Sequence, residues 1–304
     1  MDLYQTTKTI YYYPDEPDII KIIISTQGND YLNHQRQHLT TKKNKQMKYT
    51  ILEQFKLNGK SALIFGGNRG LGLAMANALA DAGANVAIAA RDTETNKKSA
   101  EAIRNAYHVD CIGLTCDVTS EEQIASTVQQ TADQFGKIDI LINSAGINIR
   151  GRIEELSFAD FQKVQQVNVN GAWIACREVV PHMKKNGYGR IINVGSMLSL
   201  TAIPERTPYA TSKGAILQLT RSLAIEVAKD QINVNALLPG PFATELNLPL
   251  LEDPEKYQAF ISKIPMNRWA EPHEIGGIAL YLASPASGFV TGAGFAIDGG
   301  WIAQ

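Results

Sequence analysis

The sequence predicts an α/β protein whose core is one doubly wound parallel sheet of about seven strands. Short apolar runs alternate with stretches of helical periodicity along most of the chain. A glycine-rich turn separates the first run from the first helix, and polar residues or a Pro-Gly turn follow several later runs. In such sheets, ligands bind beyond the carboxyl ends of the strands. The predicted strands are 61–65, 85–90, 111–118, 138–143, 190–194, 232–238 and 294–297.

Composition excludes several classes of function. The chain has 304 residues, 44% of them hydrophobic, and a net charge of -1, which gives no reason to expect a nucleic acid or an anionic membrane as partner. Three cysteines without a C-x-x-C pair or a nearby histidine at ligand spacing predict reduced core thiols and no metal site. No basic and apolar leader and no long apolar segment is visible, so we expect a cytoplasmic protein.

Residues 1–46 differ in composition from the rest of the chain, with three consecutive tyrosines, two prolines and a polar, basic stretch. They could form a disordered or partly extended arm that adds a strand to a partner, or an organellar targeting segment, which their acidic residues and scarce arginines argue against. The interpretation that we favour is that translation starts at Met47. The predicted domains are therefore an extension over 1–46 and one catalytic domain over 47–304.

The glycine-rich turn runs Gly66-Gly67-Asn68-Arg69-Gly70-Leu71-Gly72 between a predicted strand and a predicted helix that ends at Gly83. Glycines let the backbone turn tightly and approach a pyrophosphate, whose charge then lies at the positive end of the helix. The spacing G-x-x-x-G-x-G is by itself a modest signal. In this context it indicates a dinucleotide site.

The residue at the end of the second strand bears on the choice of cofactor. An acidic side chain there would bond the ribose 2'-hydroxyl of NAD, whereas a basic one suits the 2'-phosphate of NADP. That position is Arg91, and Arg69 adds a second positive charge in the glycine turn. The sequence thus favours NADP, and Asp92 beside Arg91 leaves NAD possible.

Tyr209 and Lys213 lie four residues apart in a segment with helical periodicity, so they share one face of the predicted helix. A free phenol has a pKa near ~10, and a fixed ammonium close by favours the phenolate. Tyr209 is therefore a candidate acid and base. Ser196, thirteen positions upstream, and Asn143 and Pro239-Gly240 follow other strands at the same edge of the sheet.

Taken together, these motifs resemble those of the short-chain dehydrogenase/reductase family from about Phe55 to Trp301. The resemblance implies a Rossmann-type fold, with Tyr209 as general acid and base, Ser196 polarising a substrate carbonyl, Lys213 binding the nicotinamide ribose and lowering the tyrosine pKa, and Asn168 supporting a water-mediated proton relay. The cofactor residues that it implies, besides Tyr209 and Lys213, are Gly66, Asn68, Arg69, Gly70, Leu71, Gly72, Arg91, Asp117, Val118, Asn143, Ala145, Gly146, Pro239, Gly240 and Thr244.

The substrate is the least specified part. A small molecule with a carbonyl or secondary alcohol is expected, and residues 242–269 have the length and irregularity of a substrate loop. The tail, with Asn267-Arg268-Trp269, Glu274-Ile275-Gly276-Gly277 and Asp298-Gly299-Gly300-Trp301, resembles sugar and sugar-acid members such as gluconate 5-dehydrogenase. A 3-oxoacyl-acyl-carrier-protein reductase is the alternative, and a non-catalytic dinucleotide sensor a further one. The resemblance also implies a homotetramer built through helices near 157–180 and 207–229 and the last strand.

Overall fold

The computed structural model describes residues 8–11, 21–24, 50–245 and 254–304. By contacts the chain divides into Met1–Tyr49 and Thr50–Gln304. In the first unit, strand β1 (Lys8–Tyr11) pairs antiparallel with β2 (Lys21–Ile24). The remainder of the predicted 1–46 extension lies outside the described residues. Within the described part of the chain, no helix combines the length and apolar character needed to cross a membrane.

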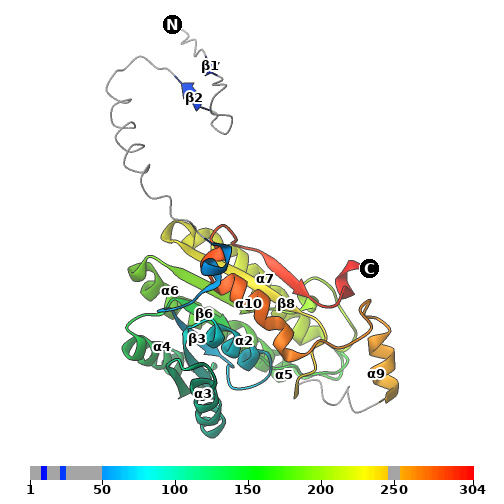
Figure 1. The fold of residues 1–304 in the computed structure, drawn as a ribbon. Coiled ribbons are helices and arrows are strands. Elements are labelled where there is room, and N and C mark those ends of the chain that lie inside the picture. The colour runs from blue at the N-terminus through cyan, green and yellow to red at the C-terminus, as the bar shows by residue number, and fades with distance from the viewer. Residues whose placement is uncertain (1–7, 12–20, 25–49, 246–253) are drawn as a thin grey trace, which may run out of the picture. The chain divides into compact units, whose positions relative to one another are not determined.

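The second unit contains the predicted seven-stranded parallel sheet, with strand order β5-β4-β3-β6-β7-β8-β9 (Figure 1). The chain starts at β3, moves outward to β5, and returns to place β6 on the other side of β3. This reversal opens a crevice at the carboxyl ends of β3 and β6, where doubly wound folds bind ligands. The strands are β3 (Ser61–Phe65), β4 (Asn85–Ala90), β5 (Cys111–Thr115), β6 (Ile140–Asn143), β7 (Gly189–Val194), β8 (Ile232–Pro239) and β9 (Gly294–Ile297).

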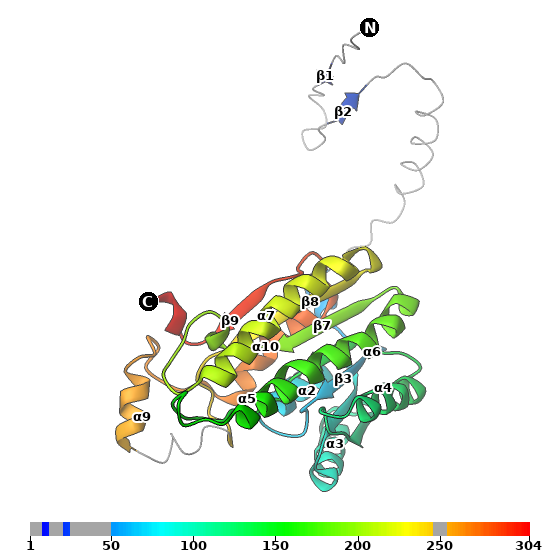
Figure 2. The ribbon, with the colours of Figure 1, turned by 180° about the vertical axis from the view of Figure 1, so that it is seen from behind.

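Alternate side chains of each central strand point into two different apolar layers. On β3, Ile64 packs with Met75 and Leu79 of one layer, whereas Leu63 and Phe65 belong to the other. The first layer is covered by α2 (Gly70–Asp81), α3 (Thr93–Tyr107) and α10 (Gly276–Ala283), and the second by α4 (Glu121–Phe135), α6 (Gly171–Asn186) and α7 (Thr207–Val227) (Figures 1 and 2).

The helix predicted from about 157 to 180 is two helices joined by one wider turn, and its predicted end at Pro181 is wrong. Helix α5 (Phe158–Gln165) passes through a π-turn at Gln166–Asn170 into α6, which continues beyond Pro181 to Asn186. Met183 is fully buried in the core layer under α6. We attribute the continuation to this packing, which outweighs the hydrogen bond that proline cannot donate.

Two further regions refine the prediction. The segment predicted as an irregular substrate loop contains a helix, α9 (Pro254–Ile261), and residues 246–253 of it lie outside the described residues. The three cysteines are free and buried, as predicted, and burial raises the pKa values of Cys111 and Cys176 to about 12. They are packing residues rather than reactive thiols.

Gly72 is required by packing of the glycine turn, because a Cβ there would collide with the carbonyl group of Gly66. Gly72→Ala is expected to lower the free energy of unfolding by about 1 to 3 kcal/mol, as overpacking usually does. Urea unfolding followed by circular dichroism measures the change.

Gly277→Ala is the matched control, since Gly277 is an exposed helical glycine whose added Cβ meets no atom within 4 Å. It should raise the free energy of unfolding by about 0.5 to 1 kcal/mol through helix propensity. Equal effects of the two substitutions would contradict the packing argument.

Candidate active site

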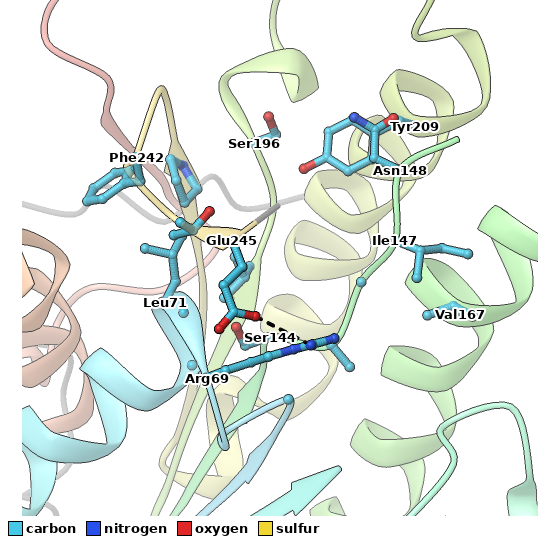
Figure 3. A pocket seen from close by; sticks show the side chains of 18 of the residues that line it. Arg69, Leu71, Ser144, Ile147, Asn148, Val167, Ser196, Tyr209, Phe242 and Glu245 are labelled. Carbon is cyan, nitrogen blue, oxygen red and sulfur yellow. Dashed lines mark hydrogen bonds and ion pairs between the residues drawn. The ribbon is translucent and has the colours of Figure 1, made fainter. Parts of the chain in front are cut away.

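A cavity of about 780 Å³ lies at the carboxyl ends of the strands. Figure 3 shows Ser196 and Tyr209 on one part of its wall, and Arg69 with Glu245 on another. Most of the residues predicted for the site line this cavity: Gly66, Asn68, Arg69, Gly70, Leu71, Gly72, Arg91, Asp117, Val118, Ala145, Gly146, Ser196, Tyr209, Lys213, Pro239, Gly240 and Thr244.

The glycine turn forms a close-packed cradle. Gly66 has φ 76°, and a Cβ on it would lie 2.7 Å from the amide nitrogen of Ala145. Gly70 has φ 52°, and the nearest atom to a Cβ there would be in Thr244, at 3.8 Å. Helix α2 begins at Gly70 with no side-chain cap. The first residues of α2 line the cavity, and the absence of a side-chain cap suits a phosphate-binding helix end.

Arg91 and Asp92 both line the cavity at the end of β4. The carboxylate of Asp92 caps helix α3 by accepting a hydrogen bond of 3.0 Å from the amide of Thr95, and this bond is the main cause that lowers the pKa of Asp92. Arg69 is exposed and lies 3.5 Å from a carboxylate oxygen of Glu245. Arg91 is thus the positively charged residue at the end of β4, whereas the carboxylate of Asp92 is hydrogen-bonded to the first turn of α3.

Of Asp117 and Asn143, only Asp117 is part of the cavity wall. Asp117 lines the cavity, and its carboxylate accepts bonds of 2.9 and 2.8 Å from the amide and hydroxyl of Thr119, which lower its pKa. Asn143 is buried and is not among the lining residues; its Nδ2 donates to Asn193 Oδ1 at 2.9 Å. Ser144, one residue later, lines the cavity instead. A cofactor contact of Asn143 stays a prediction.

Lys213 is buried on helix α7, and its Nζ donates a 2.7 Å hydrogen bond to the carbonyl oxygen of Val194 at the end of β7. Burial lowers the pKa of Lys213 to about 8. Its Nζ lies 5.5 Å from the centroid of the Tyr209 ring, one helical turn earlier. The two side chains therefore share one helix face, as the sequence predicts.

Burial and two neighbouring side chains set the direction of the Tyr209 pKa shift. Burial raises the pKa of its phenol, and the groups of the described chain that lower it are Ser196 and Arg206. Lys213 is not among these groups, and its Nζ donates to the Val194 carbonyl. A lowering of the Tyr209 pKa by Lys213 stays a prediction. The phenol thus holds its proton at neutral pH.

Ser196 is the first residue after Gly195 at the end of β7 and caps a single 3-10 turn, Met197–Ser199. Its Oγ accepts a 3.1 Å hydrogen bond from the amide of Leu198, and its own amide donates to Ser199 Oγ at 3.2 Å. These bonds fix the serine in place. The Ser196 side chain also hydrogen-bonds Tyr209, and this bond is one of the causes that lower the pKa of the phenol.

Asn168 lies in the π-turn between α5 and α6 and is almost fully buried. Its Oδ1 accepts from the amide of Ile147 at 2.8 Å, and its Nδ2 donates to the Ile147 carbonyl and to Ser212 Oγ. It does not line the cavity. A Cβ on Gly146 would lie 3.4 Å from Asn168 Oδ1 and 3.6 Å from Lys213 Nζ, so the two polar groups flank one point of the wall.

Sequence reasoning missed several lining residues beside Tyr209. Arg206 precedes Tyr209 by three residues at the start of α7, a helical spacing that could have identified it. Other missed residues follow strand β6, and their place just beyond a strand end could have identified them. Further ones come from the segment around α9. Phe260 stacks on Trp269, with ring centroids 5.1 Å apart. The missed residues include Asn148, Arg150, Ile203, Arg206, Phe260 and Trp269.

Known proteins resemble this chain over nearly its whole second unit. A family model described as enoyl-(acyl carrier protein) reductase matches residues 66–302. A 2-dehydro-3-deoxy-D-gluconate 5-dehydrogenase of Dickeya dadantii is 37% identical, covering 84% of this chain and 100% of that protein. A rhamnolipids biosynthesis 3-oxoacyl-[acyl-carrier-protein] reductase of Pseudomonas aeruginosa is 34% identical, covering 81% and 98%.

A solved structure shows the same fold. The gluconate 5-dehydrogenase of Burkholderia cenocepacia in complex with NADP and tartrate is 36% identical, with a TM-score of 0.80 over 84% of this chain and 100% of that one. With the parallel sheet, the glycine cradle and the Ser196, Tyr209 and Lys213 cluster, these matches establish that the chain belongs to the short-chain dehydrogenase/reductase family of NAD(P)-dependent oxidoreductases.

Proposed function

We propose that the protein is an NADP-preferring oxidoreductase that interconverts a carbonyl and a secondary alcohol on a sugar acid. The observation that carries this proposal is the placement of Ser196, Tyr209 and Lys213 in the same cavity as the glycine cradle. The gluconate-type names of two relatives, and the NADP complex of one of them, support the choice of cofactor and substrate. NAD stays possible as a cofactor.

When bound, the nicotinamide cofactor supplies or accepts the hydride. In the reduction direction, the Oη of Tyr209 gives its proton to the substrate oxygen, and Ser196 Oγ donates a hydrogen bond that orients and polarises the carbonyl. The raised pKa of Tyr209 keeps this proton in place at neutral pH. Lys213 would bind the ribose. A role of Asn168 in a proton relay stays a prediction, because its side chain bonds Ile147 and Ser212 and does not line the cavity. Oxidation of the alcohol follows the reverse proton path.

The cofactor residues follow from the cradle and the strand ends. The first amides of α2 suit a pyrophosphate, Arg91 suits a 2'-phosphate, and Asp117 with Val118 suits the adenine. Asp92 is engaged in capping α3, which weakens the case for a 2'-hydroxyl contact.

The alternative substrate is a 3-oxoacyl thioester, favoured by the reductase name of one relative. NADPH or NADH consumption with 5-keto-gluconate, related keto-sugars and acetoacetyl thioesters separates the two. Turnover of the sugar acid without the thioester supports the proposal, and the reverse result selects the alternative. Binding of NADPH without turnover of any carbonyl would indicate a dinucleotide sensor.

Assembly and location are part of the proposal. A homotetramer is expected, and large apolar side chains such as Trp173 and Phe289 are exposed on the described chain, which supports contacts with further copies. A cytoplasmic location and an N-terminal extension over 1–46, separate from the catalytic domain of 47–304, complete it.

Tyr209→Phe is expected to lower kcat at least a thousandfold, because the phenylalanine ring keeps the packing and removes the proton donor. The dissociation constant of NADPH, measured by fluorescence, should change by less than about threefold. Tyr107→Phe is the control, since Tyr107 packs against the core at the end of α3. Retained turnover in the Tyr209 variant would rule out this proton donor.

Arg91→Ala is expected to raise KM for NADPH by about tenfold or more, with a smaller effect on KM for NADH, because it removes a charged partner of the 2'-phosphate. Lys97→Ala removes an exposed positive charge on the following helix, outside the cavity wall, and should leave both constants unchanged. Equal losses with the two cofactors would contradict the assignment of Arg91.

A further inference from the structure

Helix α3 carries polar side chains at intervals of three residues over its first two turns. Thr93, Asn96 and Ser99 therefore lie on one side of the helix. The hydroxyls of Thr93 and Thr115 are 2.7 Å apart, and Ser99 Oγ donates a 3.1 Å hydrogen bond to the carbonyl oxygen of Asn68 in the glycine turn. Asn96, between them, is fully buried. This side of α3 is thus hydrogen-bonded to segments that lead into the cavity wall.

The side-chain amide of Asn96 joins the ends of two neighbouring strands. Its Nδ2 donates a 2.8 Å hydrogen bond to the carbonyl oxygen of Ala90, the last residue of β4, and a 2.7 Å bond to that of Leu114 in β5. The helix packs closely here, since a Cβ on Gly113 would lie 2.6 Å from the carbonyl oxygen of Asn96. The carbonyl of Ala90 and the amide of Arg91 form one planar peptide unit. The bond from Asn96 therefore fixes the backbone that carries Arg91.

Stability alone does not account for an asparagine at this position. Asn96 Oδ1 is buried and has no hydrogen-bond partner among the described residues, which is unfavourable for an amide oxygen. The carbonyl oxygen of Ala90 also accepts a 3.0 Å bond from the amide of Cys116, so it would keep a partner without Asn96. A buried amide with an unpaired oxygen calls for an explanation. The explanation that the contacts favour is control of backbone geometry at the end of β4.

Arg91 depends on its backbone for its position. Within residues 50–245 and 254–304, its side chain forms no hydrogen bond or ion pair with the chain. It lines the cavity, as does Asp117 beyond the end of β5. The pKa of Asp117 is lowered by its bonds to Thr119 and further by the charge of Arg91, so Arg91 and Asp117 lie near each other. A shift of the peptide unit before Arg91 would move this charge.

We propose that Asn96 is a positioning residue for cofactor selectivity: by holding the Ala90 carbonyl, it keeps Arg91 directed at the 2'-phosphate and maintains the preference for NADP over NAD. This inference rests on the proposed function, since it concerns how the same cavity selects its cofactor. Asn96 is buried and does not line the cavity, so it acts through Arg91 and not by contact. Its loss should weaken binding of the phosphorylated cofactor and leave proton transfer at Tyr209 unchanged.

Calorimetric titration of the full chain with NADPH and with NADH tests this role. Asn96→Ala and Asn96→Leu both remove the amide, and the leucine keeps the buried volume if the alanine variant folds poorly. Each should raise the dissociation constant of NADPH about fivefold or more and that of NADH less than about twofold, with kcat at saturating NADPH within about twofold of wild type. Thr131→Val is the matched control, since this buried hydroxyl donates a 2.8 Å bond to the Thr127 carbonyl in α4, away from the cavity wall. It should bind both cofactors as the wild type does.

A double variant separates positioning of Arg91 from general loosening of the fold. If Asn96 acts through Arg91, adding Asn96→Ala to Arg91→Ala should change the dissociation constant of NADPH by less than about twofold. Equal weakening of NADPH and NADH by Asn96→Ala, additive effects in the double variant, or a wild type that binds both cofactors equally would overturn the inference. Because binding is measured without a substrate, a wild type that binds NADPH but reduces no carbonyl compound would refute the proposed function alone.

Discussion

The ammonium group of Lys213 is buried and hydrogen-bonded to the carbonyl oxygen of Val194, and the arrangement of the site depends on this contact. It ties helix α7 to the carboxyl end of β7. Because Tyr209 lies one turn earlier on the same face, the bond also sets the phenol over the edge of the sheet. Ser196 follows Val194 by two residues, so one backbone segment positions both polar groups that would contact a carbonyl in the proposed function.

The rest of the fold forms the dinucleotide site at the same edge of the sheet. Reversal of strand order between β3 and β6 opens the crevice, and the glycine turn beside it allows close approach of phosphates. Arg91, at the end of β4, is a positive group of the same cavity. In the proposed function it binds the 2'-phosphate of the cofactor.

The sequence predicts the fold well because local patterns determine it. Alternating apolar runs locate every strand of the sheet, and β3, β4 and β9 begin and end at the predicted residues. The end of α6 is mispredicted because tertiary packing of Met183 outweighs the local effect of Pro181. Helix α9 was missed because its surroundings, rich in proline, suggest an irregular loop.

The site is predicted less completely, because the direction of a side chain and its burial depend on residues that are distant in the sequence. Motif spacing places Tyr209 and Lys213 together, yet it does not show that Lys213 Nζ bonds a backbone carbonyl or that burial raises the Tyr209 pKa. Arg150 and Arg206 are 56 residues apart in the sequence, and both line the cavity. Such a long-range arrangement leaves no periodic signal.

Unfolding of the wild type and of Lys213→Met in urea, at pH 7 and at pH 10.5, tests the burial of this ammonium most directly. The lysine pKa falls from 10.5 to about 8 on folding, so between these values the unfolded chain binds more protons and wild-type stability rises with pH. Relative to Lys213→Met, the wild type should gain about 3 kcal/mol between the two pH values. A parallel pH dependence of the two proteins would contradict the burial of the Lys213 ammonium group.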